Sequence, residues 1–329
     1  MLADGELTSN FFHFLSQAWP VPGWSLLDKN MNNIKTIFVT GISGYIGGSL
    51  AVVLKKSGYS VLGLVRRGSD AAFVQDAGMI PVRGDLNNTE VIVRALEQCD
   101  AVIHTAECDN PVIASVFLAH LRGTGKTFIY TSGSAIVANW QYPETSSFVF
   151  TEDFPLESRE PFPNRVDINK EVLRASLSGV RSIVIVPGMV YGTGLFLSKK
   201  SKQIPLLAST AKQLGNAVYI GDGNHRWSQV HIEDLAELYL AAMERAKPGS
   251  LFFAENGDAS FKEMALAIHN KLQFAGQPVS LSQEKANEYW GKMMATVALG
   301  SDCRINADKA RLFLHWSPTH TSFSESIDI

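Results

Sequence analysis

The chain contains few cysteines, with Cys99, Cys108 and Cys303 the three among its 329 residues. Their number is odd and their spacing fits no metal-binding motif, which argues against a disulfide framework and a cysteine-based zinc site. We therefore expect a reducing, cytoplasmic location and no bound metal. The chain also lacks an excess of positive charge, with 29 Lys and Arg against 32 Asp and Glu. This balance does not favour a nucleic-acid partner.

The chain has no uninterrupted apolar run near its start that could cross a bilayer. The most apolar N-terminal stretch, residues 11–19, is broken by His13, Ser16 and Gln17, whereas a membrane span needs about 20 apolar residues. No basic segment precedes it and no clear cleavage site follows, so we expect neither a secretory signal nor a membrane partner. Residues 1–33 form an N-terminal extension that is a flexible arm, a docking segment or the product of an upstream start codon.

The most informative segment that is present spans residues 36–47, with the sequence TIFVTGISGYIG. A short apolar run leads into Gly41, Gly44 and Gly47, and a helical pattern begins at once. Glycines allow a tight turn and a close approach of the backbone to phosphate, and a helix N-terminus offers free N–H groups. With a second apolar strand at residues 60–65, this segment predicts a dinucleotide-binding turn.

Apolar strands alternate with helical patterns from residue 34 to about residue 194. This alternation predicts an α/β fold with a doubly wound, parallel Rossmann sheet. Beyond that point helices dominate, so we expect residues 34–194 to bind the cofactor and residues 195–329 to form a smaller, interleaved substrate lobe. The expected strands are 36–40, 60–65, 80–83, 101–105, 127–131, 182–186, 218–220 and 250–254. The expected helices are 45–57, 70–77, 88–98, 112–122, 166–178, 201–215, 232–246, 260–272, 282–297 and 306–313.

Five short motifs follow one another in a characteristic order. They are TGISGYIG at 40–47, GDL at 84–86, HTA at 104–106, PGMVYG at 187–192, and GDG at 221–223 followed by VHIEDLA at 230–236. Together they resemble the extended and atypical short-chain dehydrogenase/reductases of the NAD-dependent epimerase/dehydratase type, over residues 34 to about 318. The resemblance implies a nicotinamide dinucleotide, a small-molecule substrate, and a homodimer formed through the helices near 112–122 and 166–178.

The expected cofactor is NADP(H). About 20 residues after the glycine turn, where an NAD enzyme carries an acid, this chain has Arg66 and Arg67. Guanidinium groups bind phosphate well, and no acid stands at this strand end. Asp85 is expected to accept a hydrogen bond from the adenine amino group. The full set of expected cofactor residues is Gly41, Ser43, Gly44, Tyr45, Ile46, Arg66, Arg67, Asp85, Leu86, Thr105, Ala106, Lys170, Pro187 and Val190.

The catalytic pattern departs from that of the superfamily. Its members normally use a Ser or Thr together with Tyr-x-x-x-Lys, and no such pair occurs in this chain. The expected serine is Ser134, with Ser132 as the alternative. The expected lysine is Lys170, which also holds the ribose, and Val166 stands where the tyrosine would be. A proton would then come from another group, and the candidates are Tyr142, Tyr191, His104, Glu107, His225 or water.

Contacts to the substrate are expected from Glu107, Tyr191, His225 and Arg226, although Tyr191 and His104 also fit packed, hydrogen-bonded core positions. The sequence favours an atypical NADPH-dependent oxidoreductase of a small carbonyl or enone compound. Two alternatives stay open: a non-redox isomerase, dehydratase or cyclase that uses the same pocket, and an NADP-binding regulatory protein without catalysis. The sequence of the substrate lobe contains no motif that identifies the substrate.

Overall fold

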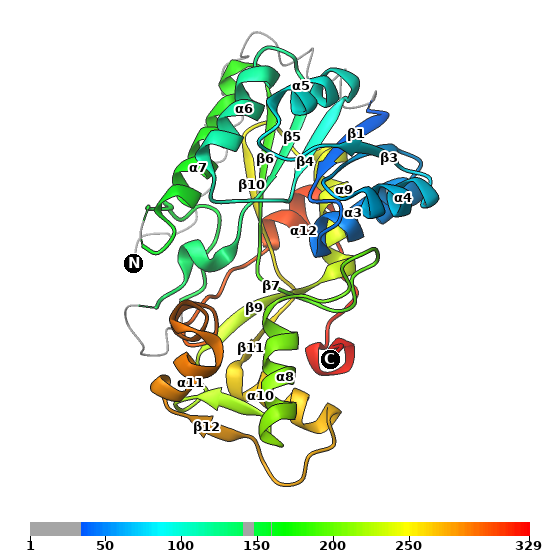
Figure 1. The fold of residues 1–329 in the computed structure, drawn as a ribbon. Helices are drawn as coiled ribbons and strands as arrows, with labels where there is room; N and C mark the ends of the chain where they lie inside the picture. The colour runs from blue at the N-terminus through cyan, green and yellow to red at the C-terminus, as the bar shows by residue number, and fades with distance from the viewer. Residues whose placement is uncertain (1–33, 141–147, 159) are drawn as a thin grey trace, which may run out of the picture.

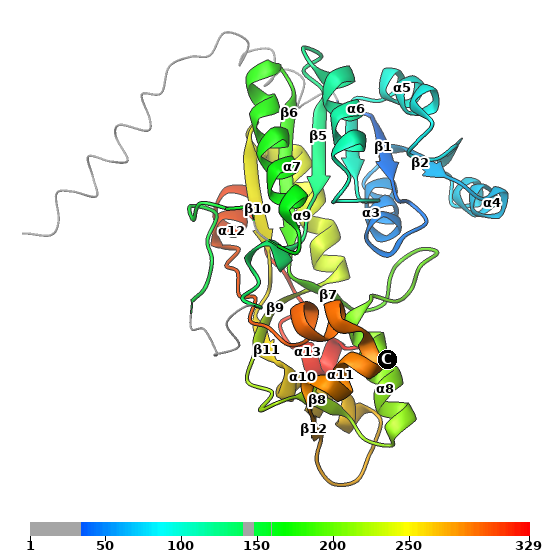
Figure 2. The same ribbon diagram turned by 60° about the vertical axis from the view of Figure 1, so that its left-hand side comes forward.

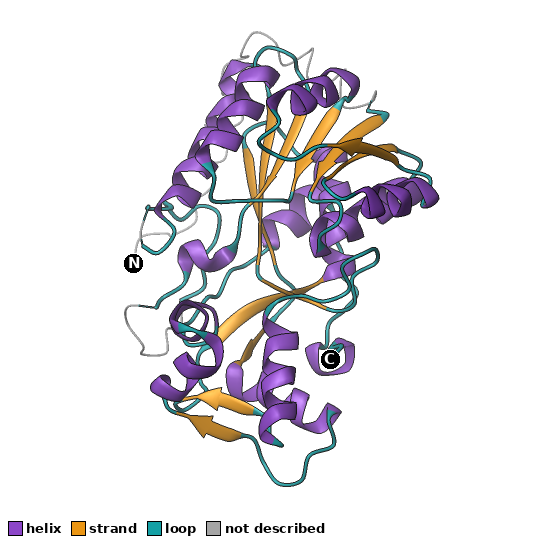
Figure 3. Ribbon diagram, in the orientation of Figure 1, coloured by secondary structure: helices purple, strands orange, loops and turns teal. Residues whose placement is uncertain are grey.

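A computed structural model describes residues 34–140, 148–158 and 160–329. These residues form one large sheet between two layers of helices, together with a smaller group of helices and short strands at one end of the sheet (Figures 1 and 3). The predicted doubly wound α/β fold is confirmed. The N-terminal extension and Tyr142 lie outside the described residues.

The large sheet has seven parallel strands in the order β10-β6-β5-β4-β1-β2-β3. Chain order reverses between β1 and β4, and ligands of such sheets bind at the carboxyl ends of the strands beside this reversal. The edge strand β10 comes from the second half of the chain. The strands are β1 Thr36–Thr40, β2 Ser60–Val65, β3 Ile80–Arg83, β4 Ala101–His104, β5 Thr127–Thr131, β6 Arg181–Pro187 and β10 Ser250–Ala254.

Helices cover both faces of this sheet (Figures 1 and 2). Alternate strand residues face opposite layers: Phe38 and Phe128 belong to the core shared with α5, α6 and α7, whereas Ile37 and Ile129 pack with α3, α9 and α12. Because both faces are covered, the strands are continuous apolar runs. The helices are α3 Tyr45–Lys56, α4 Gly68–Asp76, α5 Thr89–Gln98, α6 Pro111–Leu121, α7 Pro163–Arg174, α9 Ile232–Arg245 and α12 Asp308–Leu314.

The smaller lobe combines two short sheets, β11-β9-β7 and β12-β8, with helices α8, α10 and α11 (Figure 3). The expected helix 282–297 is interrupted, because Gly291 adopts a φ of +77° after α11 and a separate π-helical turn, η3, follows. The elements are β7 Met189–Tyr191, α8 Gln203–Leu214, β8 Val218–Ile220, β9 Arg226–His231, β11 Asp258–Ser260, α10 Phe261–Lys271, β12 Val279–Leu281, α11 Gln283–Trp290, η3 Met294–Ala298 and α13 Phe323–Ser326.

Among the described residues, no helix combines the length and the apolar character that a membrane crossing requires.

Candidate functional site

Two adjoining cavities lie at the carboxyl ends of the strands. The first, here the β2-side cavity, has a volume of about 920 Å³ and is lined by the residues that follow β1, β2 and β3. The second, here the interlobe cavity, has a volume of about 1030 Å³ and lies between the sheet and the smaller lobe. Gly44, Thr105, Ala106 and Glu107 line both cavities. The two therefore form one continuous groove across the reversal of strand order.

The glycine turn forms the bridge between the cavities. Helix α3 begins after Gly44, which provides no side-chain cap, and no acidic residue lies in its first turn. Gly41 has a φ of +77°, and a Cβ there would lie 2.8 Å from Thr105 Oγ1. A Cβ at Gly47 would lie 2.3 Å from the same atom. The turn is thus packed too tightly for side chains, and the N-terminus of α3 is available to bind an anion.

The β2-side cavity contains both expected arginines. Arg67 is paired with Asp70, with Nη2 to Oδ2 at 3.0 Å. Burial opposes the charge on Asp70, but hydrogen bonds from Ser43 and Arg67 outweigh it and lower the pKa of that carboxyl group. Arg66 is exposed and forms no ion pair with any described residue. Of the two guanidinium groups, that of Arg66 is the one left available for a ligand.

Both candidate serines line the interlobe cavity. Ser132 and Ser134 are 5% and 3% exposed, and they follow β5 directly. Ser132 Oγ accepts a hydrogen bond from Asn169 Nδ2 at 2.9 Å. Its own hydroxyl hydrogen is therefore free to donate to another acceptor.

A buried arginine lies beside these serines. Arg165 lines the interlobe cavity and donates from Nε and Nη2 to the carboxylate of Asp109, at 2.8 and 2.6 Å. Its guanidinium also stacks on Phe162, with Cζ 4.1 Å from the ring centroid. Nη1 lies next to Gly133, where a Cβ would be 3.3 Å away. The site thus holds a guanidinium, paired with Asp109, next to the loop that carries both serines.

On α7, the residues that contact the cavity are not the ones expected from the sequence. Lys170 lines neither cavity, and Val166 is 1% exposed and packed in the core. Arg165 instead lines the interlobe cavity, and Asn169 donates a hydrogen bond to Ser132, which also lines it. They are also four residues apart, so they occupy one face of the helix. Since successive residues of a helix are about 100° apart around its axis, Lys170 occupies a different face of α7 from Arg165 and Asn169.

The other cofactor residues expected from the sequence all line the groove. Gly41, Ser43, Arg66, Arg67, Asp85 and Leu86 line the β2-side cavity, Tyr45, Ile46, Pro187 and Val190 line the interlobe cavity, and Gly44, Thr105 and Ala106 line both. Asp85 is already an acceptor, because its Oδ1 receives the N–H of Asn87 at 2.8 Å.

Three of the four expected substrate residues lie away from the cavities, whereas Glu107 lines both. Tyr191 is buried, and its hydroxyl donates to the carbonyl of His320 at 3.4 Å. His225 lies 3.1 Å from Asp302, and Arg226 is paired with Asp258 and Glu263. These three side chains therefore already have hydrogen-bond or ion-pair partners inside the protein.

His104 is a hydrogen-bonded core residue, which was the alternative to a role as proton donor. Its Nδ1 lies 2.8 Å from Thr40 Oγ1, and its Nε2 lies 2.7 Å from the carbonyl oxygen of Glu107. Burial lowers the pKa of this imidazole to about 4. The ring is therefore neutral near pH 7 and has no proton to give up at that pH.

The sequence did not indicate the wall contributed by the smaller lobe. The apolar part of this wall consists of Trp227, Trp290, Met293, Met294 and Val297, and Lys200, Lys202 and Lys292 lie around it. These residues come from β9, α11, η3 and the loop before α8, which are distant in sequence. The alternation of side chains along β9 was one signal for this wall. Trp227 faces the cavity, whereas its neighbour Arg226 forms ion pairs outside the cavity lining.

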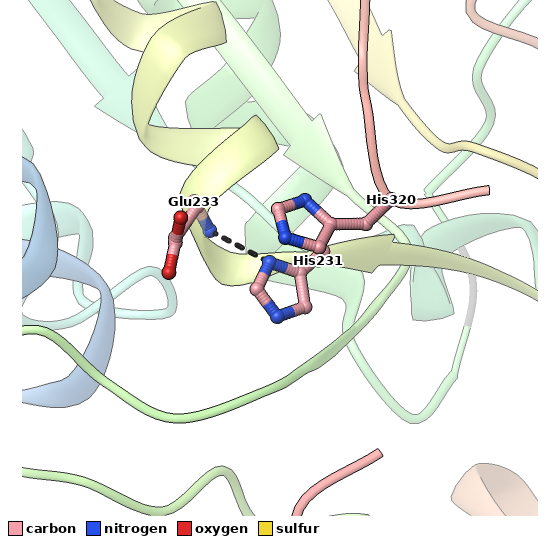
Figure 4. Close-up of side chains that lie close together, drawn as sticks. All are labelled: His231, Glu233 and His320. Carbon is pink, nitrogen blue, oxygen red and sulfur yellow. Dashed lines mark hydrogen bonds between the residues drawn. The ribbon is translucent and has the colours of Figure 1, made fainter. Parts of the chain in front are cut away.

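A second cluster lies outside the lining of both cavities, where His231 and His320 approach Glu233 (Figure 4). The two imidazoles stack with centroids 3.6 Å apart and planes 19° from parallel. One metal ion cannot lie in two such planes, and His231 Nδ1 already accepts the N–H of Glu233 at 3.3 Å. Asp234 accepts from the backbone N–H groups of Thr319 and His320. The cluster therefore fastens the C-terminal segment to the start of α9.

Comparison with known proteins identifies the family of this chain. The family model for the NAD-dependent epimerase/dehydratase family matches residues 37–252. An uncharacterised protein of Schizosaccharomyces pombe is 31% identical, with 87% of this chain and 96% of that protein covered. A 4-hydroxy-2-methyl-3-oxo-4-farnesyl-3,4-dihydroquinoline-1-oxide ketoreductase of Stigmatella aurantiaca is 25% identical, over 83% and 89%. The fold is also similar to that of dTDP-glucose 4,6-dehydratase from Bacillus anthracis in complex with NAD, with a TM-score of 0.71, 18% identity and coverage of 89% and 94%.

Proposed function

This chain belongs to the NAD-dependent epimerase/dehydratase family, and within it we propose that the protein is an NADP(H)-dependent oxidoreductase of a small organic carbonyl or enone compound. The observation that carries the proposal is the continuous groove, which runs from Arg66 and Asp85, past the glycine turn, to Ser134 and Arg165. A relative named as a ketoreductase supports the same type of reaction.

The groove fits a dinucleotide. The tight glycine turn and the uncapped N-terminus of α3 suit the pyrophosphate. Asp85 and Leu86 line the far end, where an adenine would lie. Arg66 would hold a 2′-phosphate, since its guanidinium is exposed and unpaired among the described residues. Arg67 would contribute less, because Asp70 already neutralises it.

When bound, NADPH supplies the hydride for the reduction. The chain's own residues would stabilise the negative charge that develops on the carbonyl oxygen. Ser134 and Ser132 line the cavity as hydroxyl donors, and Arg165, whose charge is paired with Asp109, would add an N–H donor from Nη1 beside them. A guanidinium does not release a proton near neutral pH, so in this proposal the final proton comes from water.

Turnover of the purified full-length protein tests this proposal. NADPH oxidation is measured with a panel of ketones, aldehydes and enones, and Ser134→Ala is expected to lower kcat about 10²–10³-fold while NADPH affinity is unchanged. Ser209→Ala, at an exposed position on α8 that lines neither cavity, is the matched control. Full turnover by Ser134→Ala contradicts the assigned role. NADPH binding without oxidation favours the regulatory alternative, and product formation without NADPH oxidation favours the non-redox one.

We also propose a cytoplasmic homodimer that pairs through α6 and α7. On α6, Val112 is 70% exposed, whereas Ile113 and Phe117 face the core. This leaves less apolar surface on the helix than its sequence suggested. Light scattering that detects only a 36 kDa species at micromolar concentration contradicts the dimer.

A further inference from the structure

The apolar part of the wall contributed by the smaller lobe offers no free N–H or O–H group from its side chains. Its two indole N–H groups are already used inside the protein: Trp227 Nε1 donates to the carbonyl of Ser301 at 2.7 Å, and Trp290 Nε1 donates to Thr210 Oγ1 at 2.9 Å. The adjoining Met293, Met294 and Val297 are apolar. A sugar ring packed on these five residues would leave the hydroxyl groups that face them without partners, which is unfavourable for binding. A hydrocarbon body suits the wall much better.

The same cavity carries an excess of positive charge. Its described lining includes Arg165, Lys200, Lys202 and Lys292, against one acid, Glu107. Arg165 is balanced by Asp109, but none of the three lysines forms an ion pair with a described residue. The lysines are exposed, so they lie at the rim of the cavity, close to water. Uncompensated cations beside an apolar wall suit a ligand that is apolar at one end and anionic at the other.

We propose that the interlobe cavity selects an apolar carboxylate that also carries the reducible carbonyl, so that the substrate is an aryl or alkyl oxo acid. The hydrocarbon body packs on Trp227, Trp290 and Met294, and the carboxylate lies among the rim lysines. The carbonyl lies at Ser134 and Arg165. This substrate class rests on the oxidoreductase function proposed above.

A matched pair of ligands tests whether the rim lysines bind a carboxylate. Calorimetry measures binding of 4-oxo-4-phenylbutanoate and of its methyl ester to the full-length protein saturated with NADP⁺. We expect the acid to bind roughly tenfold more tightly than the ester, a preference that weakens at high salt. The triple variant Lys200→Gln, Lys202→Gln and Lys292→Gln is expected to remove the preference and leave ester binding unchanged.

Two further measurements complete the test. Lys199→Gln, at an exposed lysine that does not line the cavity, is expected to keep the preference. 4-Oxopentanoate, which lacks the ring, is expected to bind more weakly than the aryl acid because it buries less apolar surface. Equal affinity for acid and ester, no binding of either, or tighter binding of UDP-glucose than of the aryl acid overturns the substrate class. Calorimetry measures binding alone, so it tests the substrate class independently of catalysis. If the acid binds but NADPH does not reduce it, the proposed oxidoreductase function is contradicted and the substrate-binding preference is not.

Discussion

The two cavities of the groove are built in different ways. The β2-side cavity is formed mainly by the turns that follow β1, β2 and β3, which are neighbours in sequence and in the sheet. The interlobe cavity draws on β5, α7, β9, α11 and η3, which are distant from one another in sequence. Local geometry fixes the first cavity, whereas packing between distant segments fixes the second. The second can therefore change its lining while the first keeps its form.

The largest expected effect comes from filling the glycine turn. In Gly47→Ala, the new Cβ would lie 2.3 Å from Thr105 Oγ1 and 2.4 Å from the carbonyl oxygen of Gly41, so the backbone must move. We expect loss of NADPH binding and a decrease of roughly 1–3 kcal/mol in the free energy of unfolding. Calorimetry and thermal unfolding measure both effects. Gly68→Ala, which would meet the tip of Arg83 at 3.5 Å, is the control and is expected to unfold like the wild type.

The next effect should be confined to the interlobe cavity. Arg165→Met keeps the volume of the side chain but removes the charge beside Ser134, and we expect a loss of about 10²-fold in kcat. NADPH affinity should not change, because the cofactor turn lies elsewhere in the groove. Steady-state kinetics and cofactor titration measure the two quantities. Arg165→Lys is expected to recover part of the activity, and equal turnover by all three proteins would remove Arg165 from the mechanism.

The two arginines of the β2-side cavity should behave unequally. Arg66→Ala is expected to weaken NADPH binding about tenfold or more, since a hydrogen bond to a charged group contributes roughly 1.5–3 kcal/mol. NADH binding should be unaffected. Arg67→Ala should have a smaller effect, because its partner Asp70 already holds the guanidinium at 3.0 Å. Fluorescence titration with both cofactors checks this, and a wild type with equal affinity for NADPH and NADH contradicts it.

The smallest effect concerns pH and the neutral His104. Burial lowers its pKa to about 4, whereas the unfolded chain binds the proton near pH 6.5. The stability from His104 is therefore complete above pH 6.5 and is lost as the pH falls toward 4. We expect a loss of about 1 kcal/mol between pH 7 and 5.5 in denaturant unfolding, and a flatter profile for His104→Gln. Identical profiles for the two proteins would contradict this prediction.

The sequence predicted the β2-side cavity well because its signals are local. A strand, three glycines and a helix in sequence define the turn, and Arg66 and Asp85 each follow a strand whose position is clear. The α7 contacts were harder to predict, because without the usual tyrosine nothing fixed the rotation of the helix. The apolar residues Val166, Ile168 and Val172 mark its buried side, and a helical wheel drawn from them would have favoured Arg165 and Asn169.

The smaller lobe could not be predicted to the same depth. Strands of three residues such as β7, β11 and β12 are too short for a period to be read. Gly291 divided the expected helix 282–297, and this break brings Met294 to the cavity. The partners of His225 and Arg226, namely Asp302 and Asp258, lie 77 and 32 residues further along the chain. Ion pairs between residues so far apart in sequence produce no local sequence pattern from which they could be predicted.

The internally bonded indoles of Trp227 and Trp290 also bear on selectivity. The apolar part of the wall, where both indole N–H groups are already used, can distinguish the hydrocarbon part of a ligand mainly by its size and shape. Such discrimination is shallow, since one methylene in an apolar pocket changes rates only about 10–200-fold. The enzyme should therefore tolerate a range of related hydrocarbon groups, and new preferences could arise through single exchanges among Met293, Met294 and Val297. Those exchanges would leave the cofactor turn untouched, which makes this wall the natural starting point for directed evolution.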